Sequence, residues 1–191
     1  MPSSVAAAEL KDLNAAFLRH AMTRAQVLDL PNWRIVSGAL YNTVWNHLTM
    51  RPETFGIKDI DLFYFDPDTS YEAEDTIIKS ATDFAKNPPI EIRNQARVHL
   101  WYEAHFGRKI APLPSVEAAI DRFACTTHCV GLCQSDQGLD LYAPFGLRDI
   151  FSFTLRPNPI QDNRKTHAIK AARALKHWPE LTVIPWPLGN A

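Results

Sequence analysis

Residues 56–66, with the sequence GIKDIDLFYFD, place two aspartates inside a run that otherwise has the composition of a buried β-strand. Ionised side chains are costly to remove from water unless another charge or a ligand compensates them. Side chains alternate between the two faces of a strand, so Asp59 and Asp61 are expected on one face, with Cα atoms roughly 6.5 Å apart. Both faces of the run are largely apolar, which predicts a central strand whose two carboxylates emerge at one end.

Neighbouring carboxylates repel each other, and this raises a pKa unless a cation neutralises the charge. Hard oxygen ligands suit Mg²⁺ or Mn²⁺. A third carboxylate is available in Glu91, which stands between two isoleucines in the strand-like segment PIEI. The pattern predicts a divalent metal site formed by Asp59, Asp61 and Glu91. Two alternatives stay open: the aspartates are surface acids on a solvated edge strand, and Glu91 is an ordinary surface residue.

An anion-binding turn is predicted just before this pair. The β-branched run WRIVS is followed by the helical pattern ALYNTVWNHL, with Ser37 and Gly38 at the change from strand to helix. A helix N-terminus presents free backbone N–H groups, which can hold phosphate oxygens. Arg97, in NQARVHLW, is a second candidate for a phosphate contact because a guanidinium matches phosphate oxygens. A structural ion pair with a carboxylate explains Arg97 equally well.

Strand-like and helical segments alternate early in the chain, and this predicts an α/β (α+β) fold with a small mixed β-sheet flanked by helices. Residues 94–107 fit either a helix or an aromatic-rich strand. The expected strands are 33–37, 60–66, 89–92 and a hairpin of 125–134 with 139–145 around SDQG. The expected helices are 6–26, 39–48, 67–86, 115–124, 146–159 and 164–178.

The length of 191 residues suits one domain over 1–191, with a core at about 30–160 and a C-terminal helix and proline-rich tail at 161–191. Twenty basic and twenty-one acidic residues leave no global field that would attract nucleic acid or a membrane. The N-terminus lacks a secretory pattern, and no run reaches the length of a membrane span. The three cysteines are crowded together, which favours a reducing cytoplasm.

Two further features have ordinary explanations. In CTTHCVGLC the residue types favour a strand, where positions four apart lie roughly 13 Å from each other, too far to share one zinc ion. Buried thiols are therefore expected at Cys125, Cys129 and Cys133. The basic residues of the last predicted helix are expected to form the solvated face of an amphipathic helix, although such a helix can also contact RNA.

The segment SGALYNTVWNHLTMRPETFGIKDIDLFYFD resembles the signature of the polymerase-β-like nucleotidyltransferase superfamily, a small glycine turn followed by Asp-hydrophobic-Asp. It is also similar to the form of this signature in tRNA CCA-adding enzymes. The motifs GALYNTVWN, KDIDLFYFD, NQARVHLW, APFGLRDIF and RPNP more closely resemble a bacterial family of small nucleotidyltransferase-family proteins. This resemblance covers residues 33–159. The stretch from Gly38 to Asp59 is longer than the usual pattern, which implies an inserted turn around MRPETFG.

The resemblance implies a polymerase-β-like nucleotidyltransferase fold and a magnesium-dependent transferase. Ser37 and Gly38 would contact the triphosphate of a nucleoside triphosphate, Asp59 and Asp61 would bind metal, and Glu91 would be the third carboxylate. A nucleoside monophosphate would pass to an unknown acceptor, either a small molecule or a protein. An RNA acceptor ranks lower because neither a separate RNA-binding domain nor a basic net charge is evident. The alternative is a catalytically silent module that binds a nucleotide or a partner on the same fold.

Overall fold

The computed structural model describes residues 16–81, 87–135 and 138–187, and within them a five-stranded mixed sheet has the strand order β3-β2-β1-β4-β5. Only β2 and β3 are parallel, and the other neighbours are antiparallel. The strand that carries Asp61 therefore lies inside the sheet, as the sequence predicted. The five strands are β1 (Arg34–Val36), β2 (Ile60–Tyr64), β3 (Ile90–Asn94), β4 (Gly131–Ser135) and β5 (Gly138–Tyr142).

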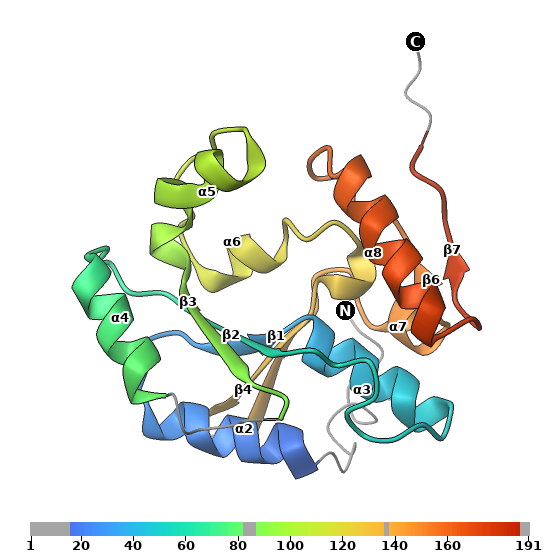
Figure 1. The fold of residues 1–191 in the computed structure, drawn as a ribbon, viewed down its shortest axis with the longest axis horizontal. Coiled ribbons are helices and arrows are strands. Elements are labelled where there is room, and N and C mark those ends of the chain that lie inside the picture. Colours follow the sequence, from blue (N-terminus) through green and yellow to red (C-terminus); the bar gives the residue numbers. More distant parts are fainter. Residues whose placement is uncertain (1–15, 82–86, 136–137, 188–191) are drawn as a thin grey trace.

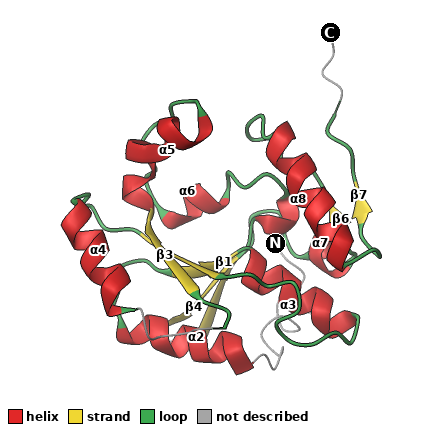
Figure 2. Ribbon diagram, viewed as in Figure 1, coloured by secondary structure: helices red, strands yellow, loops and turns green. Residues whose placement is uncertain are grey.

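Helices cover both faces of this sheet (Figures 1 and 2). A second, two-stranded sheet pairs β6 (Thr154–Leu155) with β7 (Thr182–Val183) in parallel. The helices are α2 (Ala16–Val27), α3 (Gly38–Leu48), α4 (Tyr71–Ser80), α5 (Val98–Phe106), α6 (Val116–Ile120), α7 (Arg148–Phe151) and α8 (Arg164–His177), with 3-10 helices η1 (Gln95–Arg97) and η2 (Thr126–His128).

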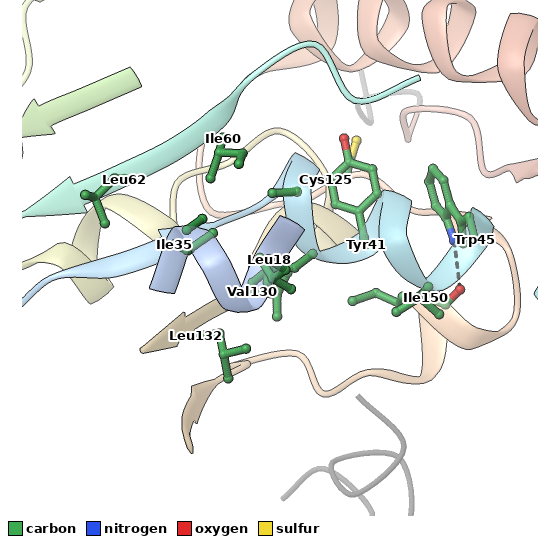
Figure 3. Packing of buried hydrophobic residues seen from close by; sticks show 14 of the residues in the cluster. Leu18, Ile35, Tyr41, Trp45, Ile60, Leu62, Cys125, Val130, Leu132 and Ile150 are labelled. Carbon is green, nitrogen blue, oxygen red and sulfur yellow. Dashed lines mark hydrogen bonds between the residues drawn. The ribbon is translucent and has the colours of Figure 1, made fainter. Parts of the chain in front are cut away.

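The alternation along β2 divides the core into two layers. Ile60 and Leu62 pack with residues of α2 and α3 in the larger hydrophobic cluster, part of which is drawn in Figure 3. Phe63, on the opposite face, packs with α6 residues in the smaller clusters. Asp61 shares the Phe63 face because side chains two apart on a strand point the same way. The fold therefore directs Asp61 away from the main core.

Helix α8 is attached to α3 through Trp178, which follows its last turn. The Trp178 side chain is buried, and its Nε1 donates a hydrogen bond to Asn46 Oδ1 at 3.1 Å. Gly56, with φ of 69°, lies against the same ring, and a Cβ there would stand 2.5 Å from a Trp178 ring carbon. Asn46 Nδ2 donates to the carbonyls of Glu53 and Phe55, which fixes the predicted inserted turn. These contacts hold α8 close to the start of β2.

Two segments differ from the sequence prediction. The strand expected over 125–134 begins only at Gly131, because the preceding residues form η2 and bury Cys125 and Cys129. Cys133 is half-buried. The helix expected over 146–159 ends at Phe151, and the chain then enters β6, which finds its partner in β7 near the C-terminus. Local periodicity carries no signal for such a long-range strand pair.

Other expectations are resolved within the described residues. The ambiguous segment 94–107 is helical, as η1 and α5, and α5 ends at Gly107 with φ of 71°. Helix α4 begins with a Ser70 cap, whose Oγ accepts from the Ala73 N–H at 3.3 Å. The hairpin β4–β5 is present. Residues 6–15, 82–86 and 136–137 of the expected helices and turn lie outside the described residues. In the part of the chain that is described, no helix has the length and apolar character needed to cross a membrane.

His128 is buried and stacks on Tyr41, with ring centroids 4.7 Å apart. Burial, together with the nearby charges of Lys170 and His167, lowers the pKa of His128 to about 3. A histidine whose pKa falls on folding stabilises the protein fully above its unfolded pKa, and this contribution is lost as the pH falls below that value. His128 therefore makes the fold sensitive to acid.

We expect the unfolding free energy to fall by about 2 kcal/mol between pH 7 and pH 5 because of His128 alone. The substitution His128→Phe keeps an aromatic ring against Tyr41 and should remove that part of the pH dependence. Urea unfolding of both proteins at the two pH values measures the difference. Equal pH dependence in the variant and the original protein would contradict the assignment.

Candidate functional site

A narrow cleft lies where α3 begins, β2 begins and α8 passes over both. Its volume is about 60 Å³, which is room for an ion or a few phosphate oxygens and not for a whole nucleotide. The lining includes Ser37, Gly38, Asp59 and Asp61, so four of the six residues predicted from the sequence meet in one place. The cleft also receives Lys170 and Arg173 from α8.

The three predicted carboxylates come from two neighbouring strands. Asp61 lies within β2, and Asp59 immediately precedes Ile60, the first residue of that strand. Glu91 lies on β3 directly beside Asp61 in the parallel register. Parallel strands are about 4.8 Å apart, and residues in register on them point to the same face. The expected neighbouring strand with its third carboxylate is therefore present.

Asp61 lies in an environment that disfavours its negative charge. Its partial burial, followed by the negative charges of Asp59 and Glu91, raises the pKa of Asp61 to about 6, and Lys170 and Arg93 act in the opposite direction. Desolvation and like charges both disfavour an ionised carboxylate. Burial and the neighbouring carboxylates thus both act against the ionised form of Asp61.

The chemistry of these oxygen donors fits Mg²⁺ or Mn²⁺, whereas their arrangement does not yet form a closed set of ligands. Among the described residues, no group of three or more His, Cys, Asp and Glu side chains is placed so that it would hold a metal ion. Asp59 Oδ2 accepts a hydrogen bond from Lys58 Nζ at 3.0 Å. The Lys58 side chain is largely exposed, and exposed ion pairs contribute little stability, so a divalent ion can compete with it.

The N-terminus of α3 faces the same cleft. Ser37 has φ of 55°, a conformation that few residues other than glycine adopt, and its side chain makes no capping hydrogen bond to the helix. Its N–H donates to the Val130 carbonyl at 2.9 Å, which holds the turn to β4. Asn42 lines the cleft as well, and its Oδ1 is buried without a hydrogen-bond partner. Backbone strain and an unpaired buried acceptor are both typical of binding sites.

Lys170 and Arg173 were interpreted from the sequence as part of a solvated helix face. They are exposed, but they line the cleft opposite Ser37 and Asp61, because Ala171, Ala174 and Trp178 bury the adjoining face of α8. The periodicity of the helix marks its buried face and does not show what lies beside its polar residues. No signal in the chain distinguishes these two cations from the other basic residues of α8.

Arg97, the sixth predicted residue, is not brought to the cleft. It is buried at the opposite end of β3, where its Nε lies 3.4 Å from Glu74 Oε2 and its Nη1 donates to the Ser70 carbonyl. Asn94 beside it donates to the carbonyls of Asp66 and Asp68. The ion-pair interpretation of Arg97 therefore describes its observed contacts, and the expected phosphate contact has no support from its position.

The fold has a counterpart among solved structures. A solved NMR structure superposes on this chain with a TM-score of 0.70. It is described as revealing a CCA-adding enzyme head domain. The two chains are 24% identical, and the match covers 87% of this chain and 88% of the other. At this level of identity the likeness concerns the fold alone, which is that of the CCA-adding enzyme head domain. No curated protein gives a significant sequence match.

Family membership follows from the sequence itself. The profile of a family described as nucleotidyltransferase matches residues 23–183, a range that includes the α3 turn, both aspartates and α8. The chain belongs to this nucleotidyltransferase family.

Proposed function

We propose that the protein is a metal-dependent nucleotidyltransferase that transfers a nucleoside monophosphate from a nucleoside triphosphate to an acceptor and releases pyrophosphate. The observation that carries this proposal is the cleft itself. In it a helix N-terminus and two cationic side chains face the aspartates of β2 across a space of about 60 Å³. Phosphates and divalent cations are the ligands that such a combination attracts.

The α3 side of the cleft suits the triphosphate. The free N–H groups of the first turn and the positive end of the helix dipole favour an anion. A Cβ at Gly38 would meet only Asn42 Nδ2, at 3.8 Å, so no protein atom requires glycine there. A glycine at such a position permits close approach of a ligand to the backbone. Lys170 and Arg173 would contact the phosphate oxygens from the other side.

The carboxylate side suits the metal. Asp59 and Asp61 would bind Mg²⁺ or Mn²⁺, and Glu91 would bind the same ion or orient the acceptor hydroxyl. A bound divalent ion would offset the repulsion that raises the pKa of Asp61, and it would stabilise the charge that develops on phosphate oxygens during transfer. Asp59 would exchange its contact with Lys58 for this ion. The chain's own residues thus hold the phosphates on one side and the acceptor hydroxyl on the other.

The transfer replaces a phosphoanhydride bond of the nucleoside triphosphate by a phosphate ester bond to the acceptor. The oxygen of the acceptor hydroxyl forms a bond to the α-phosphorus, and the bond from that phosphorus to the bridging oxygen of the β-phosphate breaks. Pyrophosphate leaves with the electron pair, and the hydroxyl proton passes to a carboxylate such as Glu91 and then to water. Little covalent chemistry is required of the protein beyond placing and neutralising these groups.

The test is a pyrophosphate-release assay with labelled nucleoside triphosphates, Mg²⁺ or Mn²⁺, and either the small-molecule or the protein fraction of a cell extract. We expect metal-dependent pyrophosphate release and label on an acceptor from one of the fractions. Binding of a nucleotide that raises the melting temperature without pyrophosphate in any fraction would favour the catalytically silent module. A melting temperature unaffected by all four nucleotides would rule out both functions. Strongly salt-dependent binding of RNA would place RNA above the other acceptors.

A further inference from the structure

A second and larger cavity lies on the same face of the sheet as the carboxylates. Phe63 and Arg93 line it, and they follow Asp61 and Glu91 by two residues on β2 and β3. Side chains two apart on a strand point to the same face, so the cavity lies next to the two carboxylates along the strands. Its other walls come from α5, α6 and the first turn of α8, the three helices grouped above the sheet in Figure 1. Its volume is about 600 Å³.

Aromatic rings form much of the wall. Trp101 is 38% exposed and Phe106 is 51% exposed, although both lie in a contiguous group of rings on α5. A contiguous group of large exposed apolar side chains marks a binding surface more often than a surface that only faces solvent. A flat or apolar molecule in the cavity would cover them. The aromatic lining residues are Phe63, Trp101, Tyr102, Phe106 and Phe123.

The polar part of the wall is strongly cationic. Five basic side chains line the cavity against a single acidic one, Asp162, in a chain whose net charge is −1. Arg122 and Lys165 form no ion pair within the residues described. Arg108 is held in place by hydrogen bonds to Tyr102 Oη at 3.1 Å and Asn163 Oδ1 at 2.9 Å. A guanidinium without an ion pair, as at Arg122, fits carboxylate or phosphate oxygens.

The dimensions favour a small molecule. A volume of about 600 Å³ falls in the range of roughly 300–1,000 Å³ typical of small-molecule sites. A polynucleotide would need a basic track that continues beyond one cavity, and the near-neutral chain gives no global field for it. The lining therefore fits an organic anion with an aromatic or apolar body.

We infer that this cavity binds the acceptor substrate, and that the acceptor is a small organic anion with a ring or apolar body and a reactive hydroxyl. The inference rests on the proposed function, because Asp61 lines the cleft proposed to hold the phosphates, and Phe63, two residues further along β2, lines this cavity. An acceptor whose ring lies on Phe63 and Phe106, with its anionic group at Arg122, would extend its hydroxyl towards the carboxylates. The α-phosphorus would meet it from the cleft side.

The test uses the aromatic sulfonate 8-anilinonaphthalene-1-sulfonate, whose fluorescence rises in an apolar site. The protein should bind this probe saturably without nucleotide or metal. Removing one charge-assisted contact with Arg122→Gln should weaken binding about tenfold. Phe106→Ala should weaken it as well. The matched controls are Arg148→Gln and Phe145→Ala, which change exposed residues outside this cavity and should bind the probe as the original protein does.

Competition identifies the ligand. Displacement of the probe by phenyl phosphate or by phenylacetate supports the proposal, and the stronger competitor shows whether phosphate or carboxylate is preferred. Unchanged probe affinity in both cavity variants would overturn it. Stronger displacement by a 12-nucleotide oligouridylate would contradict a small-molecule acceptor and favour RNA. Displacement by ATP with Mg²⁺ alone would contradict the acceptor assignment and favour the nucleotide base as the ligand of the cavity.

The outcome of the probe-binding experiment does not depend on whether the protein transfers a nucleoside monophosphate. Probe binding needs no transfer, so its failure leaves pyrophosphate release unaffected, and a protein that releases no pyrophosphate still reports probe binding. Where transfer is observed, Arg122→Gln should raise the KM for the acceptor and leave the KM for the nucleotide unchanged. A rise confined to the nucleotide KM would contradict the acceptor assignment.

Discussion

Replacing Asp61 with asparagine is expected to reduce metal-dependent pyrophosphate release by at least about 10²–10³-fold, the loss that follows removal of one preorganised charge-stabilising group. Asparagine keeps the shape of the side chain and removes the charge that would hold a divalent ion. The fold should persist, because the neutral side chain avoids the desolvation and repulsion that raise the pKa of Asp61. Pyrophosphate release and thermal unfolding, measured on the same preparation, separate the two effects.

Asp29→Asn is the matched control. Asp29 is exposed, lies between α2 and β1, and has φ of 49°, a conformation that asparagine also adopts readily. Its substitution should leave both measurements unchanged. Full activity in Asp61→Asn, with a folded protein, would contradict the assignment of metal binding to β2.

The double substitution Lys170→Gln and Arg173→Gln should weaken nucleotide binding by about 100-fold, or about tenfold for each charge-assisted contact. Both side chains line the cleft from α8, opposite the helix N-terminus that is proposed to hold the triphosphate. The loss should shrink at high ionic strength, since exposed charges are screened by salt. Calorimetric titration with each of the four nucleoside triphosphates at low and high salt measures it.

The matched control is the double substitution Lys176→Gln and Arg148→Gln. It also removes two positive charges, but from exposed positions outside the cleft. Nucleotide affinity should not change in this control. If both double variants lose affinity equally, the effect is one of net charge and the cleft cations have no specific role. If neither loses affinity, the triphosphate does not lie beside α8.

Much of the fold was predictable because its signals are local. The apolar residues on both faces of the run at 60–64 indicated the central strand, and the small residues Ser37 and Gly38 between a β-branched run and a helical pattern indicated the turn. The sequence indicated only that Glu91 lies in the next strand-like segment. The parallel pairing of β2 with β3, which sets Glu91 beside Asp61, comes from the structure.

The mistaken parts depend on distant contacts. The segment after α7 reads as helix by composition, but Thr154 and Leu155 pair with β7, which lies near the other end of the described chain. Arg97 is a different case, because the sequence left a phosphate contact and a structural ion pair equally open, and only the tertiary structure places it against Glu74. Residue type alone does not distinguish these environments.

The sequence by itself determined the strand with its aspartates, the turn before α3 and the family, because alternation, turn chemistry and motif spacing are properties of neighbouring residues. Only the tertiary structure decided which charges surround the carboxylates. Trp178 links α8 to Asn46 by a hydrogen bond, and Lys170 of this helix lines the cleft. The exposed rings of α5 line the cavity beside Phe63. The physical reason is that helical periodicity specifies which face is buried, whereas the partner of the polar face is set by long-range packing.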